Sequence, residues 1–92
     1  MSKVNVEIPH RLSRQEARNR IQNATPRLES EYSAVCQWEG ESRLLVTRKG
    51  LKAALDIEDS RVRVAIELGF LLGPLGNSIR AGIVRQLTEM LS

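Results

Sequence analysis

The sequence predicts an α+β domain, in which a five-stranded antiparallel sheet carries two helices on one of its faces. Three observations predict it: short segments with strict apolar alternation, two longer segments with helical periodicity, and tight-turn residues between successive segments. The expected order is strand, helix, four strands, helix. At 92 residues the chain has the length of one domain, which we expect to span residues 1–92.

The N-terminal segment predicts a strand followed by a helix. Apolar and polar residues alternate over residues 3–8, and Pro9 ends the expected strand. Ser13 and Glu16 then form a capping box, in which each satisfies a backbone amide of the first helical turn. The helix is therefore expected to start at Ser13.

The first helix carries one narrow apolar stripe. Apolar residues recur at steps of three and four through residues 17–32. Pro26 interrupts this stripe, because its ring removes the backbone hydrogen bond to the carbonyl of Gln22 and crowds that turn. We expect a kinked or broken helix at this point.

The clearest prediction concerns the last hairpin. If Asp59 and Ser60 form a two-residue turn, opposite charges face each other on one side of the hairpin and apolar residues on the other. On the charged side, the expected pairs are Glu58 with Arg61, Asp56 with Arg63 and Lys52 with Glu67. On the apolar side, they are Ile57 with Val62, Leu55 with Val64, Ala53 with Ile66 and Leu51 with Leu68. A slip of one residue would invert the two faces, so the pattern selects this register.

Two further turns extend the same sheet. Lys49 and Gly50 predict a tight turn that places Val46 opposite Ala53 and continues the apolar face. A turn near Gly40 adds one more strand. We expect the first strand to pair with the last, which gives the spatial order 1-5-4-3-2. This architecture is similar to the TATA-binding-protein-like fold, of which the helix-grip proteins are larger relatives.

A second helix follows the stretch from Gly69 to Gly76, with Pro74 in its first turn. Its main apolar stripe comprises Leu72, Leu75, Ile79, Ile83, Leu87 and Met90. Two apolar residues fall beyond this stripe, and one lies at its other edge. Apolar residues that do not cover the sheet are free to meet a partner. With the neighbouring aromatic residue they form the candidate apolar partner-binding surface: Phe70, Leu71, Val84 and Leu91.

The chain carries no recognisable set of catalytic residues. His10 is the only histidine, and no nucleophile motif accompanies it, so we expect an exposed loop residue. Cys36 is the only cysteine and is expected to be a small buried side chain. One Cys and one His cannot supply the four ligands of a zinc site. We therefore expect no catalytic residue, no cofactor, no metal and no enzymatic activity.

Charge gives a weak indication of the partner. The net charge is +3, with 14 basic and 11 acidic residues interspersed along the chain. The candidate basic patch at the start of the first helix comprises Arg11, Arg14, Arg18 and Arg20. The expected open sheet face also carries acidic residues and lacks stacking aromatic residues, which argues against nucleic acid as a partner.

The expected location is the cytoplasm. No apolar run approaches the ~20 residues that a membrane span requires. The N-terminus lacks the apolar core of a signal peptide. A single cysteine permits no internal disulfide, which fits a reducing compartment.

Three stretches resemble the polyhydroxyalkanoic acid system protein family. They are H-x-L-S-x-x-E-A-R at residues 10–18, C-Q-W-E-G at residues 36–40 and R-V-R-V-A-I-E-L-G-F-L-L-G-P-L at residues 61–75. The resemblance covers nearly the whole chain. It implies a bacterial cytoplasmic protein linked to storage-polyester granules or to their regulation, and it brings no catalytic or ligand residues with it.

Three hypotheses for function follow. The first is a non-enzymatic accessory protein that binds the polyhydroxyalkanoate granule surface, or granule proteins, through apolar side chains. The second is a module that holds a small apolar ligand between the sheet and the C-terminal helix, which a tightly filled core without a cavity would exclude. The third is a weak nucleic-acid-binding domain that uses the basic patch. The sequence also leaves open a homodimer.

Overall fold

The computed structural model describes residues 2–92, and within them the chain forms five strands and two α-helices. In chain order the elements are β1 (Ser2–Pro9), α1 (Arg14–Tyr32), β2 (Val35–Glu39), β3 (Arg43–Arg48), β4 (Leu51–Ile57), β5 (Arg61–Leu68), a short 3₁₀ turn η1 (Gly73–Leu75) and α2 (Gly76–Leu91). The predicted element order is confirmed. Residue 1 of the expected 1–92 domain lies outside the described residues.

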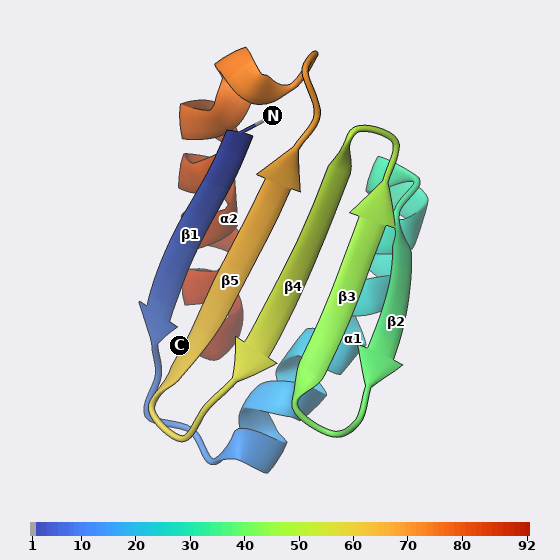
Figure 1. Ribbon diagram of the computed structural model, residues 1–92. Coiled ribbons are helices and arrows are strands. Elements are labelled where there is room, and N and C mark those ends of the chain that lie inside the picture. The colour runs from blue at the N-terminus through green and yellow to red at the C-terminus, as the bar shows by residue number, and fades with distance from the viewer. Residues whose placement is uncertain (1) are drawn as a thin grey trace.

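The strands form one antiparallel sheet with the spatial order β1-β5-β4-β3-β2. Both helices lie behind this sheet, α2 behind β1 and β5 and α1 toward the opposite edge (Figure 1). The predicted α+β class, strand order and one-sided helix packing are therefore confirmed. The similarity to the TATA-binding-protein-like fold stays a prediction.

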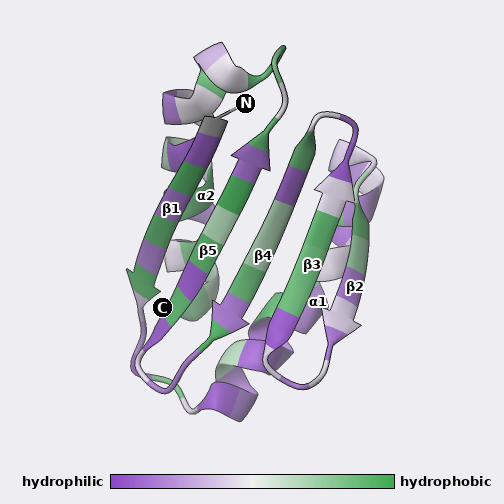
Figure 2. Cartoon of the chain, viewed as in Figure 1, coloured by the Kyte–Doolittle hydropathy of each residue, from purple (hydrophilic) through white to green (hydrophobic). Residues whose placement is uncertain are grey.

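The β4–β5 hairpin has the predicted register. Leu55 lies opposite Val64, Asp56 lies opposite Arg63, and the pairs on either side follow in step. Every second residue of β5 from Val62 to Leu68 is buried, and the residues between them are exposed. The colour bands of Figure 2 show the same alternation of apolar and polar residues along the strands. The helices thus pack on the apolar face of this hairpin.

The open face of the sheet carries a row of alternating charges. The register aligns one residue from each strand, in the order Glu7, Arg63, Asp56, Arg43 and Glu39. Glu7 lies 3.7 Å from Arg63, and Glu39 lies 3.9 Å from Arg43. Since each charge has an opposite neighbour on the next strand, this face is a neutralised surface.

One detail of this row differs from the expected pairing. Asp56 accepts hydrogen bonds from the Nε and Nη2 atoms of Arg43, at 2.7 and 3.2 Å. Arg63 turns instead toward Glu7 and Glu58. Asp56 and Arg63 face each other as predicted, but among the described residues no ion pair joins them. The guanidinium on β3 therefore competes successfully for the carboxylate of Asp56.

Double-mutant cycles can measure this preference. We expect the coupling free energy between Arg43 and Asp56 to exceed that between Asp56 and Arg63, because only the first pair is hydrogen-bonded. The coupling should weaken as salt is added. Alanine variants of the three residues, compared by urea unfolding, provide both cycles. Equal coupling in the two cycles would show that Asp56 does not prefer Arg43 over Arg63.

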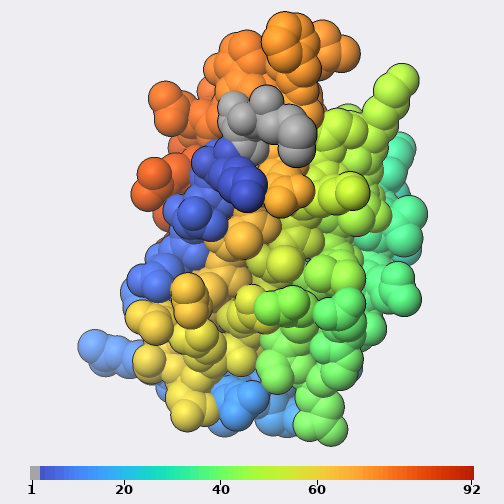
Figure 3. Space-filling model, in the orientation of Figure 1, coloured from blue at the N-terminus to red at the C-terminus, as the bar shows by residue number. Residues whose placement is uncertain are grey.

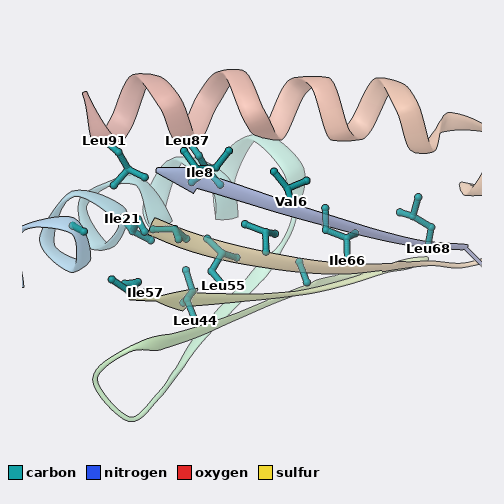
Figure 4. Packing of buried hydrophobic residues seen from close by; sticks show 14 residues of the cluster. Val6, Ile8, Ile21, Leu44, Leu55, Ile57, Ile66, Leu68, Leu87 and Leu91 are labelled. Atoms are coloured by element: carbon teal, nitrogen blue, oxygen red, sulfur yellow. The ribbon is translucent and has the colours of Figure 1, made fainter. Parts of the chain in front are cut away.

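The core lies between the sheet and the helices. Ala17 and Ile21 of α1 are fully or almost fully buried against it. Leu87 and Leu91 project from α2 toward β1, close to Ile8 (Figure 4). Burial of each such aliphatic side chain contributes about 1.5–3 kcal/mol. The core thus depends most on the N-terminal half of α1 and the C-terminal half of α2.

The first helix is not broken at Pro26. α1 runs without interruption from Arg14 to Tyr32, so the expected break is absent. The carbonyl of Gln22, which Pro26 leaves without its usual amide donor, accepts a hydrogen bond from the Thr25 hydroxyl at 2.9 Å. A side-chain donor one residue before the proline therefore replaces the lost backbone bond. The predicted cap is present, with the Ser13 hydroxyl accepting from the amide of Glu16.

His10 is buried, which corrects the expectation of an exposed loop residue. Only 8% of its surface is exposed. Its Nδ1 atom accepts from the amide of Leu12 at 3.1 Å, which leaves Nε2 to donate to the carbonyl of Glu58 at 2.9 Å. Its own amide donates to the carbonyl of Ser60 at 2.9 Å. His10 thus ties the β1–α1 connection to the β4–β5 turn.

Replacing this imidazole should destabilise the fold. We expect His10→Ala to lower the free energy of unfolding by about 1–3 kcal/mol, because the amide of Leu12 and the carbonyl of Glu58 lose their partners in a buried site. Chemical denaturation measures the change. Arg11→Ala, at the exposed neighbouring position, is the control and should change stability little. A loss no larger than in that control would contradict the role of His10.

Candidate apolar binding surfaces

The second helix is rotated relative to the predicted stripe. It begins at Gly76, so Leu71 and Leu72 precede it and do not extend its apolar face. Leu87 and Leu91 point into the core, at 5% and 4% exposure. Ile79 and Ile83, expected at the centre of the buried stripe, are only partly buried. The face that packs on β1 is therefore displaced toward Leu91.

This rotation divides the candidate partner surface. Leu91 is a core residue, so its assignment to a free surface is wrong. Val84 is partly buried and packs against the core cluster. Phe70 and Leu71 are 87% and 84% exposed. Only these last two residues of the predicted set remain available for contact.

Phe70 and Leu71, together with Leu75 at 50% exposure, form what we call the loop patch. It belongs to the connection between β5 and α2, which projects at one end of the molecule (Figure 3). Large apolar side chains at such exposure lose contact with water only when another surface covers them. The loop patch is thus a candidate contact surface.

The backbone holds this loop in a defined shape. The amide of Gly69 donates to the carbonyl of Gly50 at 2.8 Å, which ties the loop to the β3–β4 turn. The amides of Leu72 and Gly73 both donate back to the carbonyl of Gly69, at 3.1 and 3.0 Å. A Cβ atom at Gly50 would lie 3.2 Å from Leu72 Cδ1, so the leucine packs closely over this glycine. Phe70 and Leu71 are presented by a hydrogen-bonded turn.

A second apolar feature lies between the helices. Arg20 of α1 donates to the carbonyl oxygens of Met90 and Ser92 and so ties α1 to the end of α2. From there the helices separate toward the end where α1 stops and α2 starts (Figure 1). The space between them is a cleft of about 410 Å³, which we call the interhelical cleft.

The walls and floor of the interhelical cleft are mostly aliphatic. The sheet provides the floor through Val46, Leu51, Leu55 and Val64. Leu28 and Tyr32 of α1 form one wall, and Ile79, Ile83 and Met90 of α2 form the other. The hypothesis of a ligand between sheet and C-terminal helix requires unfilled space at this place. The structure contains that space.

Few polar groups line this cleft. The Gln86 amide nitrogen donates to the Tyr32 hydroxyl oxygen at 3.1 Å, across the gap between the helices. Arg48, at the end of β3, also lines the cleft. Val46 points to the helices, and Arg48 lies two residues further along the strand, so its side chain leaves the sheet on the same face. The cleft combines an apolar interior with one basic side chain.

The basic patch is largely engaged within the protein. Arg14 lies 3.7 Å from Asp59, and the Arg18 guanidinium lies 4.3 Å from the centre of the Trp38 ring. Arg20 donates to the carbonyl oxygens of Met90 and Ser92 at the end of α2. Of the predicted patch, which comprises Arg11, Arg14, Arg18 and Arg20, the last three thus have partners within the protein. This arrangement disfavours the nucleic-acid hypothesis.

The structure offers no activated nucleophile at Cys36. Burial, and secondarily the nearby charge of Glu29, raise the pKa of its thiol above the ordinary value. The thiolate, which is the reactive form, is therefore disfavoured at neutral pH. Within residues 2–92, no three His, Cys, Asp or Glu side chains lie close enough together to hold a metal ion.

Neither helix of the described chain has the length and apolar composition needed to cross a membrane.

The fold and these two surfaces define a small α+β domain that has an exposed apolar loop and an apolar cleft. The chain belongs to the family described as putative polyhydroxyalkanoic acid system proteins, whose model matches residues 4–91. The family resemblance predicted from the sequence is thereby confirmed. No significant match to the chain was found among curated proteins or among solved structures.

Sequence reasoning did not find the lining of the interhelical cleft. The sequence did indicate one of these residues. Val46 is predicted to face the helices, and Arg48 lies two residues further along the same strand, so it must lie on the same face. Tyr32 ends the predicted apolar stripe of the first helix, but for Gln86 and Gly82 no local signal exists. Their meeting depends on the angle between the two helices, which periodicity does not encode.

Gly82 offers a direct test of the open space. It lines the cleft, and a Cβ atom at this position would have no neighbour within 4 Å. We expect Gly82→Ala to stabilise the protein by up to about 1 kcal/mol, because glycine is unfavourable inside a helix. Gly50→Ala is the contrasting variant and should destabilise, since Gly50 has φ of +84°. Urea unfolding measures both. A destabilised Gly82→Ala would mean that the space is filled.

Proposed function

We propose that this protein is a non-enzymatic accessory protein of the polyhydroxyalkanoate system, and that it attaches to the granule surface through the loop patch. Family membership supports the connection with storage polyester. The observation that carries the attachment is the exposure of Phe70 and Leu71 on a hydrogen-bonded turn. In this proposal the protein is bacterial and cytoplasmic, and it moves between the cytoplasm and the granule.

The size of the loop patch favours reversible attachment. Burying Phe70 and Leu71 contributes about 1.5–3 kcal/mol each. Losses of translational and rotational freedom on association amount to about 4–15 kcal/mol. Two side chains therefore give weak binding for a single copy, comparable to a single short lipid anchor. Attachment then depends on many copies at the surface or on added contacts at the rim.

Basic side chains lie at that rim. The β3–β4 turn contains Lys49 and Gly50, and Gly50 is hydrogen-bonded to the loop at Gly69. Arg48 precedes them, and both basic residues are exposed. An apolar patch with cations beside it resembles the composition by which amphipathic segments settle on interfaces that carry some negative charge. Residues 48 and 49 thus suit a supporting electrostatic role.

The proposal can be tested with isolated granules. A tagged protein, expressed in polyester-producing cells, should sediment with the granules, and the double variant Phe70→Ser/Leu71→Ser should lose about nine-tenths or more of the bound fraction. Its melting temperature should stay close to that of the unsubstituted protein, because neither side chain belongs to the core.

A matched control is available at Val35. This residue is 62% exposed and lies on β2, at the sheet edge opposite β1. Val35→Ser removes an exposed apolar side chain outside the loop patch and should leave the granule-bound fraction unchanged. Unsubstituted protein that stays entirely in the supernatant would falsify direct granule binding. Equal losses in the two variants would show that the loop patch is not the contact.

A further inference from the structure

We propose that the interhelical cleft binds an aliphatic monocarboxylate, with the hydrocarbon chain between α1 and α2 and the carboxylate at Arg48. This site shares Leu75 with the loop patch, but Phe70 and Leu71, which carry the granule proposal, do not line the cleft. The inference therefore stands apart from the granule proposal, and each can fail without the other.

The shape of the cleft favours a single extended chain. Its volume of about 410 Å³ lies within the ~300–1,000 Å³ range of small-molecule sites. A helix with its side chains is about 10 Å wide, whereas an extended hydrocarbon chain is much narrower and suits a space between two helices. A hydrocarbon chain can lie along Leu55, Ile79 and Ile83 without leaving any polar group unpaired.

The polar groups of the cleft indicate the charge of the ligand. Tyr32 and Gln86 are hydrogen-bonded to each other, so neither requires a ligand. Arg48 is the sole charged residue that lines the cleft in the described part of the chain. Among the described residues it takes part in no ion pair, whereas Arg14, Arg43 and Arg63 each have a carboxylate partner. A guanidinium at the rim of an apolar cleft selects a carboxylate, which it can bind through two parallel hydrogen bonds.

The position of Arg48 fits the entrance. It ends β3, next to the turn that Gly69 contacts, and it is exposed. A carboxylate placed there keeps contact with water while its chain enters the cleft, so the ligand charge is not buried. The ligand class is therefore a fatty acid or hydroxy acid with a chain of medium length. The carboxylate and the aliphatic chain are common to both.

Calorimetric titration with octanoate and decanoate, kept below their micelle concentrations, tests this site. We expect saturable one-to-one binding that tightens about fourfold for each added methylene, hence about fifteenfold between the two acids. Arg48→Gln should weaken decanoate binding about tenfold and leave methyl decanoate unaffected. The ratio of affinities for 3-hydroxydecanoate and decanoate tells whether polyester precursors or simple fatty acids are preferred.

Two variants separate the site from nonspecific binding. Gly82→Leu fills the cleft from α2, where a side chain meets open space, and should reduce decanoate binding at least tenfold without loss of thermal stability. Arg85 does not line the cleft but lines a second groove on the side of the helices away from the sheet, together with Arg27 and Glu89. Arg85→Gln should therefore leave the affinity for decanoate unchanged.

Three results would overturn the proposal: no saturable binding, equal decanoate affinities in the Arg48 and Arg85 variants, or undiminished binding by Gly82→Leu. Sedimentation analysis adds a fourth. A dimer of the unsubstituted chain that Gly82→Leu dissociates would show that a second copy occupies the cleft.

Discussion

The register of the β4–β5 hairpin decides which side of the sheet meets the helices. Side chains alternate strictly along each strand. The pairing of Leu55 with Val64 therefore also determines which residues of the neighbouring strands face the helices. It places the aliphatic residues under α1 and α2 and aligns the charged row from Glu7 to Glu39 on the other face. His10 reinforces this arrangement, because it binds the connection after β1 to the β4–β5 turn.

The two helices cover the apolar face unequally. The buried residues of α1, which are Ala17, Ile21 and Thr25, all precede Pro26, whereas those of α2, Leu87 and Leu91, lie in its C-terminal half. The helices run in opposite directions, so these residues meet at the same end of the molecule (Figures 1 and 4). The core is closed at that end. Toward the other end the helices separate, and the interhelical cleft is the space that remains.

The two most exposed large apolar side chains of the described residues, Phe70 and Leu71, lie at the open end. The loop patch and the mouth of the cleft are joined through Leu75, which belongs to both. The two proposals assign different tasks to them: Phe70 and Leu71 contact an extended surface, and the cleft holds one chain. In these proposals the partner of the loop patch is a polymer surface, and the partner of the cleft is an aliphatic acid. A common location would allow a bound acid to influence attachment, since Leu75 contacts both sites.

The sequence by itself determined the strands, their order and the register of the last three strands, because alternation, turn residues and cross-strand charges are local and agree with one another. It also identified Phe70 and Leu71 as exposed and the family as that of the polyhydroxyalkanoic acid system proteins. Only the tertiary structure decided that Asp56 pairs with Arg43, that His10 is buried, and that Leu91 belongs to the core. These outcomes depend on long-range geometry: which of two neighbouring guanidiniums reaches a carboxylate, which loops meet, and how a helix is rotated on the sheet. The cleft between Tyr32 and Ile83 arises in the same way, from an angle between helices that no residue pattern specifies.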